Sequence, residues 1–157
     1  MIELRLATSA DVETCLAVQR RSAITGYAHI FPQEQFPFPD DVVRAEWVER
    51  LGSEATVVLA ADGGRIVGTI SARPPRVEAL FVVPESWGAG VADVLHARAL
   101  EVIANAGYDE AELEVMADNT RARRFYERHG WLPDGRQLRS PFPPFPELVG
   151  YRRALDR

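Results

Sequence analysis

The segment from Leu80 to Asp93 contains residues whose types and order suit the binding of an anion. An apolar run that ends at Pro84 leads into Trp87-Gly88-Ala89-Gly90-Val91-Ala92 and then into residues with helical spacing. The first N–H groups of a helix have no partners within the helix, and its dipole places partial positive charge there. Glycines also let an anion approach the backbone. The segment therefore predicts a phosphate or pyrophosphate site, with a tight turn that needs glycine only for packing as the alternative.

A nicotinamide dinucleotide fits this turn less well than another phosphate-bearing ligand. Asp93 stands where the third glycine of the dinucleotide fingerprint belongs. Two hairpin-like strands precede the turn, whereas that fingerprint belongs to a repeated βαβ unit.

The composition excludes several classes of chemistry. All 18 basic residues are arginine, so neither a lysine Schiff base nor a phosphate loop ending in Gly-Lys-Ser/Thr can form. Cys15 is the only cysteine, which excludes an internal disulfide and a cysteine-based zinc site. His29, His96 and His129 lack the spacing of metal ligands, so we expect no metal.

Charge and hydropathy limit the partners. The formal net charge of −5 disfavours nucleic acid and anionic membranes as partners, because both are bound through clustered positive charge. No apolar run approaches 18 residues, and the N-terminus has no signal-like pattern. We expect a soluble, cytoplasmic protein with one domain over residues 1–157.

The spacing of apolar residues predicts the elements that position the glycine turn. Strands are expected over 2–7, 56–61, 65–72, 76–83, 110–115 and about 148–155. Helices are expected from about 12, from 91 to about 107 and from 119 to 129, and a short one after residue 40 or 41 with Val43, Trp47 and Leu51 on one face. Thr8 with Asp11 forms a capping-box pattern, Asp40 or Asp41 is the expected cap of the second helix, and Asn119 that of the last. Asp62-Gly63-Gly64 predicts a hairpin. The order predicts a mixed α/β (α+β) domain on one central sheet.

A second motif gives the glycine turn a family context. Asn119-Thr120-Arg121-Ala122-Arg123-Arg124-Phe125-Tyr126 is followed by Gly130-Trp131. Together with Leu80-Phe81-Val82-Val83-Pro84 and the glycine turn, this pattern resembles the GCN5-related N-acetyltransferase (GNAT) family. The resemblance extends from Ile2 to about Trp131, and more loosely to Leu155. It implies a single acyl-CoA acyltransferase domain with a central, mostly antiparallel sheet flanked by helices.

The resemblance implies roles for particular residues. Acetyl-CoA would be the acyl donor, with its pantetheine arm paired to the strand at Leu80, Phe81 and Val82, as in strand addition. Asn119 would contact the same arm, and Tyr126 would protonate the departing thiolate. The backbone N–H groups expected to hold the pyrophosphate belong to Gly88, Ala89, Gly90, Val91, Ala92 and Asp93. Trp87 departs from the family pattern, which has Gln or Arg there, so a side-chain contribution to phosphate binding is expected to be lost.

Acyl transfer to an amine also needs a base and an oxyanion partner. The N–H of Val82 is suited to the oxyanion. Glu78, which is expected on one strand face with Leu80 and Val82, and Glu114 on the next strand are the candidate bases, beside a water relay. Each glutamate is alternatively a solvated strand residue, and Tyr126 is alternatively a packing aromatic.

Two aromatic segments rich in proline, residues 27–38 and 140–146, map to the side from which the family's acceptor enters. They predict either an apolar acceptor pocket or parts of the core or of a dimer interface. Glu34, Asp40 and Asp41 would favour a cationic amine there. Arg121, Arg124 and Arg128 form a basic stripe, which is either a solvated face or a contact for the adenosine 3′-phosphate.

These observations predict an acetyl-CoA-dependent N-acetyltransferase that acetylates an amine of a small molecule or peptide by direct attack on the thioester. The alternative is a non-catalytic acyl-CoA-binding or sensing domain with the same fold. Neither nucleic acid nor a membrane is expected as a partner, and a homodimer is consistent with the resemblance. The sequence does not identify the acceptor.

Overall fold

One open sheet organises the computed structural model, which describes residues 1–156. Its strands are β1 (Ile2–Leu6), β2 (Thr56–Asp62), β3 (Arg65–Arg73), β4 (Arg76–Val82), β5 (Glu110–Met116), β6 (Leu132–Arg139) and β7 (Glu147–Ala154). The helices are α1 (Val12–Gly26), α2 (Asp40–Leu51), α3 (Val91–Asn105) and α4 (Thr120–Arg128). Short 3₁₀ turns at Ser9–Asp11 and Pro84–Ser86 precede α1 and the glycine turn. None of these helices is long and apolar enough to cross a membrane.

The strand order is β1-β2-β3-β4-β5-β7-β6, and every neighbouring pair except β4 and β5 is antiparallel. The predicted mixed, mostly antiparallel sheet is therefore confirmed. The sequence analysis did not predict β6, whose sequence Leu-Pro-Asp-Gly-Arg-Gln-Leu-Arg lacks an apolar alternation. This edge strand is defined by its pairing with β7, interrupted by an irregularity between Pro133 and Gln137.

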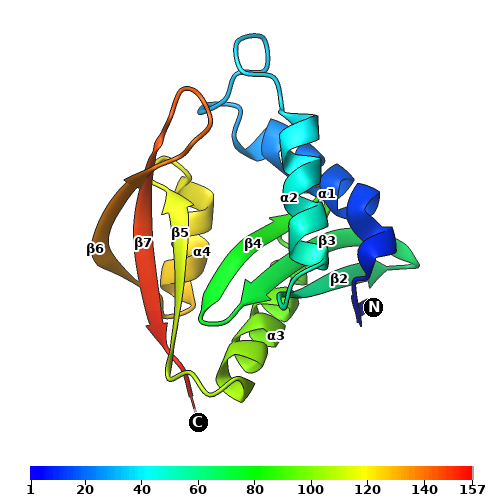
Figure 1. The fold of residues 1–157 in the computed structure, drawn as a ribbon, viewed down its shortest axis with the longest axis vertical. Helices are drawn as coiled ribbons and strands as arrows, with labels where there is room; N and C mark the ends of the chain where they lie inside the picture. The colour runs from blue at the N-terminus through cyan, green and yellow to red at the C-terminus, as the bar shows by residue number, and fades with distance from the viewer. Residues whose placement is uncertain (157) are drawn as a thin grey trace.

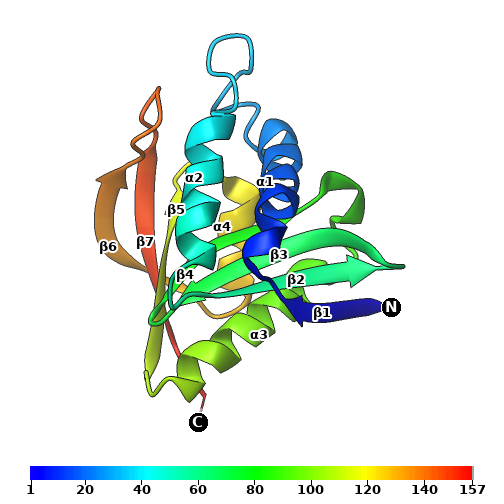
Figure 2. The same cartoon turned by 45° about the vertical axis from the view of Figure 1, so that its right-hand side comes forward.

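Alternating side chains build a separate core on each face of the sheet. On β2, Val57 and Leu59 pack with α1 and α2, whereas Val58 and Ala60 pack with the apolar face of α3. Neighbouring residues of a strand point to opposite faces, so one short apolar run serves both cores. Figures 1 and 2 show α1 and α2 over one face of β2–β4 and α3 on the other.

Several local signals predicted from the sequence are confirmed. The hairpin between β2 and β3 turns at Gly63 and Gly64, with φ of 59° and 81°, and Thr8 forms its capping box. The cap predicted for the second helix is wrong: α2 begins at Asp40 itself, after Pro39, and neither aspartate caps it. Asp40 and Asp41 instead pair with arginines.

The sheet splits between β4 and β5. These parallel strands are paired only at Arg76 and Glu112, beside a hydrogen bond from the Glu112 N–H to the Pro75 carbonyl. Beyond this point the two strands diverge, as Figure 1 shows. Beyond Arg76 and Glu112, the facing edges of β4 and β5 therefore do not hydrogen-bond to each other. Their backbone groups are open to a ligand in the gap.

Candidate active site

A cavity of about 500 Å³ lies at the gap between β4 and β5. It gathers all of the sequence-predicted site residues except Ala89. Those brought together are Glu78, Leu80, Phe81, Val82, Trp87, Gly88, Gly90, Val91, Ala92, Asp93, Glu114, Asn119 and Tyr126. The cavity is also lined by Tyr27, which the sequence analysis placed only in the first aromatic segment, and by Arg121 of the predicted basic stripe.

The end of β4 presents backbone groups to this cavity. The Val83 N–H donates to the Val67 carbonyl of β3, at 2.9 Å. Successive residues of a strand direct their N–H and C=O groups to opposite sides. The polar groups of Val82 therefore face the gap, while those of Phe81 face β3. Strand addition by a ligand can use the backbone of Val82, and Phe81 contributes its ring, which lines the cavity.

The glycine turn opens onto the same cavity. Gly88 and Gly90 have φ of 79° and 87°, and a Cβ atom at either would meet nothing within 4 Å. Positive φ is the conformational reason for glycine, and the open space leaves the backbone approachable. The first-turn N–H groups of α3, on Val91, Ala92 and Asp93, have no partners within the helix. This turn has the local geometry of an anion cradle.

Trp87 bridges β4 and α4 at the edge of this cradle. Its indole N–H donates to the Val82 carbonyl at 2.7 Å. The guanidinium of Arg121 stacks on the indole, with Cζ 3.6 Å from the ring centroid. Burial lowers the pKa of Arg121, and within residues 1–156 no acidic group pairs with it. The structure thus brings a cation to the position where the sequence predicted a lost side-chain contact.

Two of the three arginines in the predicted basic stripe turn toward the cavity. Arg121 and Arg128 line it, whereas Arg124 does not. A solvated face therefore describes only part of this stripe.

Tyr126 lies on α4, whose start is fixed by the predicted cap. The Asn119 Oδ1 accepts from the Ala122 N–H at 3.2 Å, and both Asn119 and Tyr126 are buried. The Tyr126 ring packs edge-on against Phe125 and Trp131. Burial, and then the nearby Tyr27, raise the pKa of Tyr126 well above its usual range, so the phenol stays protonated. Burial likewise raises the pKa of Tyr27 to about 12. Tyr126 therefore packs against its aromatic neighbours and also lines the cavity.

Glu78 is placed by a bulge that the sequence did not reveal. Ser71 pairs with Ala79 and Ala72 pairs with Val77, so Glu78 is the extra residue of β4. Bulges re-aim side chains. The Glu78 carboxylate accepts from the Ser71 hydroxyl at 3.1 Å and lies 3.3 Å from the Arg73 Nε.

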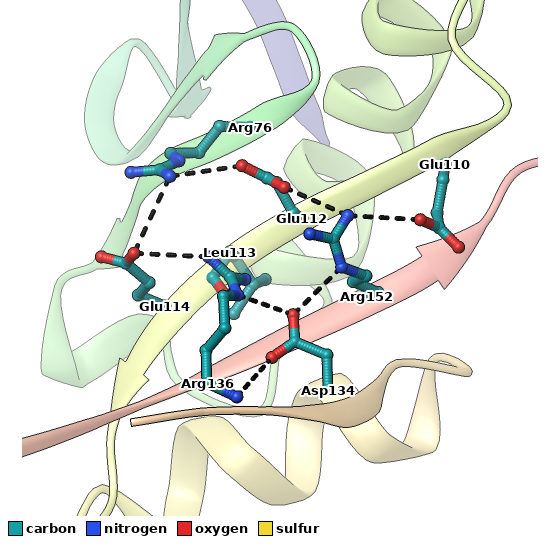
Figure 3. Close-up of polar contacts among 8 residues, drawn as sticks. All are labelled: Arg76, Glu110, Glu112, Leu113, Glu114, Asp134, Arg136 and Arg152. Carbon is teal, nitrogen blue, oxygen red and sulfur yellow. Dashed lines mark hydrogen bonds and ion pairs between the residues drawn. The ribbon is translucent and has the colours of Figure 1, made fainter. Parts of the chain in front are cut away.

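Glu114 belongs to a ladder of charges across β4, β5, β7 and β6, shown in Figure 3. Its carboxylate lies 3.5 Å from Arg136 and 3.8 Å from Arg76. The ladder continues through Glu112, Arg152 and Asp134. Arg76 therefore lies between two carboxylates of β5 at the point where β4 and β5 begin to separate, so Glu114 has a structural role in addition to its place on the cavity.

A second cavity of about 750 Å³ adjoins the first. It shares Tyr27, Glu78, Phe81 and Glu114 with the first, among other residues, and reaches between the two aromatic segments predicted from the sequence. The acids proposed from the sequence to favour a cation there do not line it: Glu34 is exposed, and the two aspartates pair with Arg20 and Arg44. Glu46 of α2 lines it instead.

The fold and the cavity together define a class of enzyme. A split sheet, a backbone edge at Val82, an anion cradle at a helix N-terminus and a buried tyrosine suit an acyltransferase whose donor is a thioester with a pyrophosphate. Residues 13–131 match the model of the acetyltransferase (GNAT) family. The match covers more than half of the chain, so this chain belongs to the acetyltransferase (GNAT) family, an acyltransferase class with acetyl-CoA as donor. Within residues 1–156, no group of His, Cys, Asp or Glu side chains is arranged to hold a metal ion.

Solved structures share the whole fold at low sequence identity. A GCN5-related N-acetyltransferase from Rhodopseudomonas palustris superposes with a TM-score of 0.82 at 19% identity, covering 98% of this chain and 95% of that one. The PaiA N-acetyltransferase from Thermoplasma acidophilum, in complex with coenzyme A, has a TM-score of 0.79 at 18% identity, covering 98% and 99%. At these identities, the likeness shows the fold.

A curated relative is more similar in sequence over a shorter stretch. A mycothiol acetyltransferase from Clavibacter sepedonicus is 34% identical over 94 residues, which are 57% of this chain and 30% of that protein. The match therefore spans about a third of the relative's length.

Proposed function

We propose that this chain is an acetyl-CoA-dependent N-acetyltransferase that transfers an acetyl group to an amine of a small molecule or peptide. The observation that carries the proposal is the first cavity, where the backbone N–H of Val82, the glycine turn and Tyr126 meet. A backbone donor and a phenol suit a thioester, and the glycine turn suits a pyrophosphate. The family match and the fold support the same donor.

The proposed reaction is a direct attack on the thioester. The amine nitrogen forms a bond to the acetyl carbonyl carbon, and the Val82 N–H donates to the oxygen as it gains negative charge. The carbon–sulfur bond then breaks, and the thiolate takes the proton of the Tyr126 hydroxyl. Burial keeps the Tyr126 hydroxyl protonated, so the proton that this step needs is present before the thiolate forms.

The amine must lose a proton during attack. Glu78 and Glu114 remain the proposed acceptors of that proton, directly or through water, because both line the region shared by the two cavities. Their arginine partners hold both carboxylates in place, which favours a water relay over a large movement of either side chain.

The pyrophosphate would lie on the glycine turn. The N–H groups of Gly88, Gly90, Val91, Ala92 and Asp93 would donate to it, whereas the Ala89 N–H is bonded to the Ser86 carbonyl. Arg121, held on Trp87, would supply the side-chain contact that Gln or Arg makes at position 87 in the family motif. Asn119, also on the cavity, would contact the pantetheine arm.

Titration calorimetry with acetyl-CoA, using NADH as the control ligand, tests the donor. We expect saturable binding of acetyl-CoA and none of NADH. Arg121→Gln should weaken acetyl-CoA binding about 5- to 20-fold, since it removes a charged hydrogen-bond donor. It should leave the affinity for S-acetylpantetheine, which lacks the pyrophosphate, unchanged.

Arg124→Gln is the matched control, because Arg124 lies on the same helix away from the cavity. Equal losses in both variants would assign the effect to overall charge. Absence of acetyl-CoA binding would overturn the proposed donor. Binding without turnover of any amine would favour the non-catalytic acyl-CoA-binding domain.

A further inference from the structure

The second cavity has walls that are already in place without a ligand. Its rings are Tyr27, Phe31, Phe36, Phe38, Phe81 and Phe142, all half-buried, so none is part of the fully buried core. A volume of about 750 Å³ is that of a small-molecule site. The rings contribute an apolar surface that only an occupant with its own apolar body would cover.

The first aromatic segment is held by its own polar contacts. The Gln33 side chain donates to the Phe31 carbonyl at 3.1 Å and accepts from the Phe38 N–H at 3.0 Å. The His29 ring bonds the Asp118 carbonyl at 2.8 Å, which ties the segment to the connection between β5 and α4.

The second aromatic segment closes on itself. The Ser140 N–H donates to the Pro146 carbonyl at 2.9 Å, and the Phe145 N–H donates to the Phe142 carbonyl at 2.7 Å. Because these hydrogen bonds order both segments before a ligand binds, the entropy cost of ordering them on binding is reduced.

The charged residues of the cavity leave one carboxylate without a partner. Three carboxylates and two guanidinium groups line it, an excess of one negative charge. Glu78 and Glu114 lie beside arginines, as described above, whereas Glu46 makes no hydrogen bond or ion pair within the described residues. Burial raises the pKa of Glu46, which Arg50 partly offsets.

The two arginines of the cavity lie within ion-pair distance of other carboxylates. Arg50 lies 4.0 Å from Glu78, and its charge also partly offsets that of Glu46. Arg76 lies between Glu112 and Glu114. A ligand in the cavity therefore meets aromatic walls and the carboxylate of Glu46, which within residues 1–156 has no hydrogen-bond or ion-pair partner.

Resting on the proposed function, we propose that the acceptor is a small cationic amine with one aromatic or similarly bulky apolar group and no carboxylate, selected by the phenylalanine walls and by the charge of Glu46. Glu46 is a specificity-determining residue in this proposal. The rings bind the apolar body, and Glu46 favours a cation over a zwitterion within a cavity of low polarity.

Steady-state acetylation of 2-phenylethylamine, ethanolamine and phenylalanine tests the acceptor class. The rate is measured from the CoA thiol that each turnover releases. We expect kcat/KM for 2-phenylethylamine to exceed that for ethanolamine about 10- to 100-fold, from burial of the ring. We expect a preference of about tenfold for 2-phenylethylamine over phenylalanine, which adds a carboxylate.

Matched variants separate the walls from the charge. Phe142→Ala should lower kcat/KM for 2-phenylethylamine about tenfold and leave ethanolamine unchanged, while Phe145→Ala, in the same segment but exposed and off the cavity, changes neither. Glu46→Gln should abolish the preference over phenylalanine mainly through KM. Glu34→Gln, an exposed acid outside the cavity, should not.

The outcomes distinguish this inference from the proposed function. Acetyl-CoA affinity, measured by calorimetry on each variant, should stay within twofold of the parent. If acetyl-CoA binds but kcat/KM for ethanolamine or phenylalanine equals that for 2-phenylethylamine, the proposed acceptor class is wrong. A phenylalanyl tripeptide used better than any of the amines would also overturn it. Failure of acetyl-CoA binding would instead overturn the donor.

Discussion

Tyr126 is a buried tyrosine whose phenol stays protonated, and it lines the first cavity. Tyr126→Phe should keep the ring packing and remove only the hydroxyl, with the proton that it would donate. We expect kcat to fall about 10- to 1000-fold, the usual range for a general acid. The affinity for acetyl-CoA should change little. Steady-state kinetics with calorimetry on the same preparation measures both.

Tyr108→Phe is the matched control, because Tyr108 is exposed and distant from the cavity lining. Since the pKa of Tyr126 is raised, ionisation of this residue should impose no alkaline decline in kcat below about pH 10. Unaltered turnover in the Tyr126 variant would remove this residue from the mechanism.

Asp11 shows how one carboxylate supports the start of α1. The side chain accepts from Arg5 at 2.9 Å and from the Thr8 N–H at 2.8 Å, and these bonds lower its pKa to about 2. A lowered pKa stabilises the folded state above the unfolded value near 4, and the contribution is lost as pH falls through about 2. We expect Asp11→Asn to lower the free energy of unfolding by about 1–2 kcal/mol at pH 7.

Urea denaturation between pH 2 and 7 measures this effect, and the difference between variant and parent should disappear near pH 2. Asp41→Asn serves as the comparison, since Asp41 is 99% exposed in its pair with Arg44. A constant difference at every pH would assign the loss to packing and not to the charge.

At the scale of elements, the position of α3 depends on one glycine in β3. A Cβ at Gly68 would meet Val91 Cγ1 at 2.9 Å and Leu95 Cδ1 at 3.0 Å. Both contacts are too short, and both residues are fully buried. The first turn of α3 can therefore approach the sheet only because this residue has no side chain.

Gly68→Ala should push the N-terminus of α3 away from β4. We expect a loss of about 1–3 kcal/mol in stability, typical of overpacking, and weaker acetyl-CoA binding because the N–H groups of the turn shift. Thermal unfolding and calorimetry test the two effects. Gly26→Ala, whose Cβ would meet only the Trp87 ring at 3.7 Å, should lower neither property substantially. A Gly68 variant with parental stability would show that α3 adjusts without cost.

For the whole molecule, the split between β4 and β5 is the feature that a donor would exploit. The two parts of the sheet are paired at a single position of these strands, and the charge ladder of Figure 3 lies beside that position. A ligand in the gap would add backbone hydrogen bonds where the sheet has none, and it would contact both parts.

Binding to the folded state alone raises stability by about 2.7 kcal/mol at a ligand concentration 100 times the Kd. For a chain of this size, this corresponds to a rise of about 5 to 10 °C in Tm. Differential scanning fluorimetry with acetyl-CoA should show this rise, and NADH at the same concentration should not. A Tm unchanged by saturating acetyl-CoA would argue against a site between the two parts of the sheet.

The sequence by itself determined the features that depend on neighbouring residues. The alternation of the strands, the turn at Gly63 and Gly64, the Asn119 cap and the two motifs all act within a few residues, and they predicted the fold class and the family. β6 was missed because its pairing with β7, and not its apolar pattern, defines it. The cap of α2 was wrong because the helix begins at Asp40 itself, where Asp40 pairs with Arg20 of α1 and Asp41 pairs with Arg44 one turn further along α2.

Only the tertiary structure decided which distant side chains share a cavity. The stack of Arg121 on Trp87 joins α4 to the glycine turn, and the bulge at Glu78 depends on the register of two strands. Glu46 gave no sequence signal, because a single acid on an amphipathic helix is ordinarily solvated. Its environment comes from aromatic segments separated by more than 100 residues, and such contacts are set by packing in three dimensions and not by local spacing.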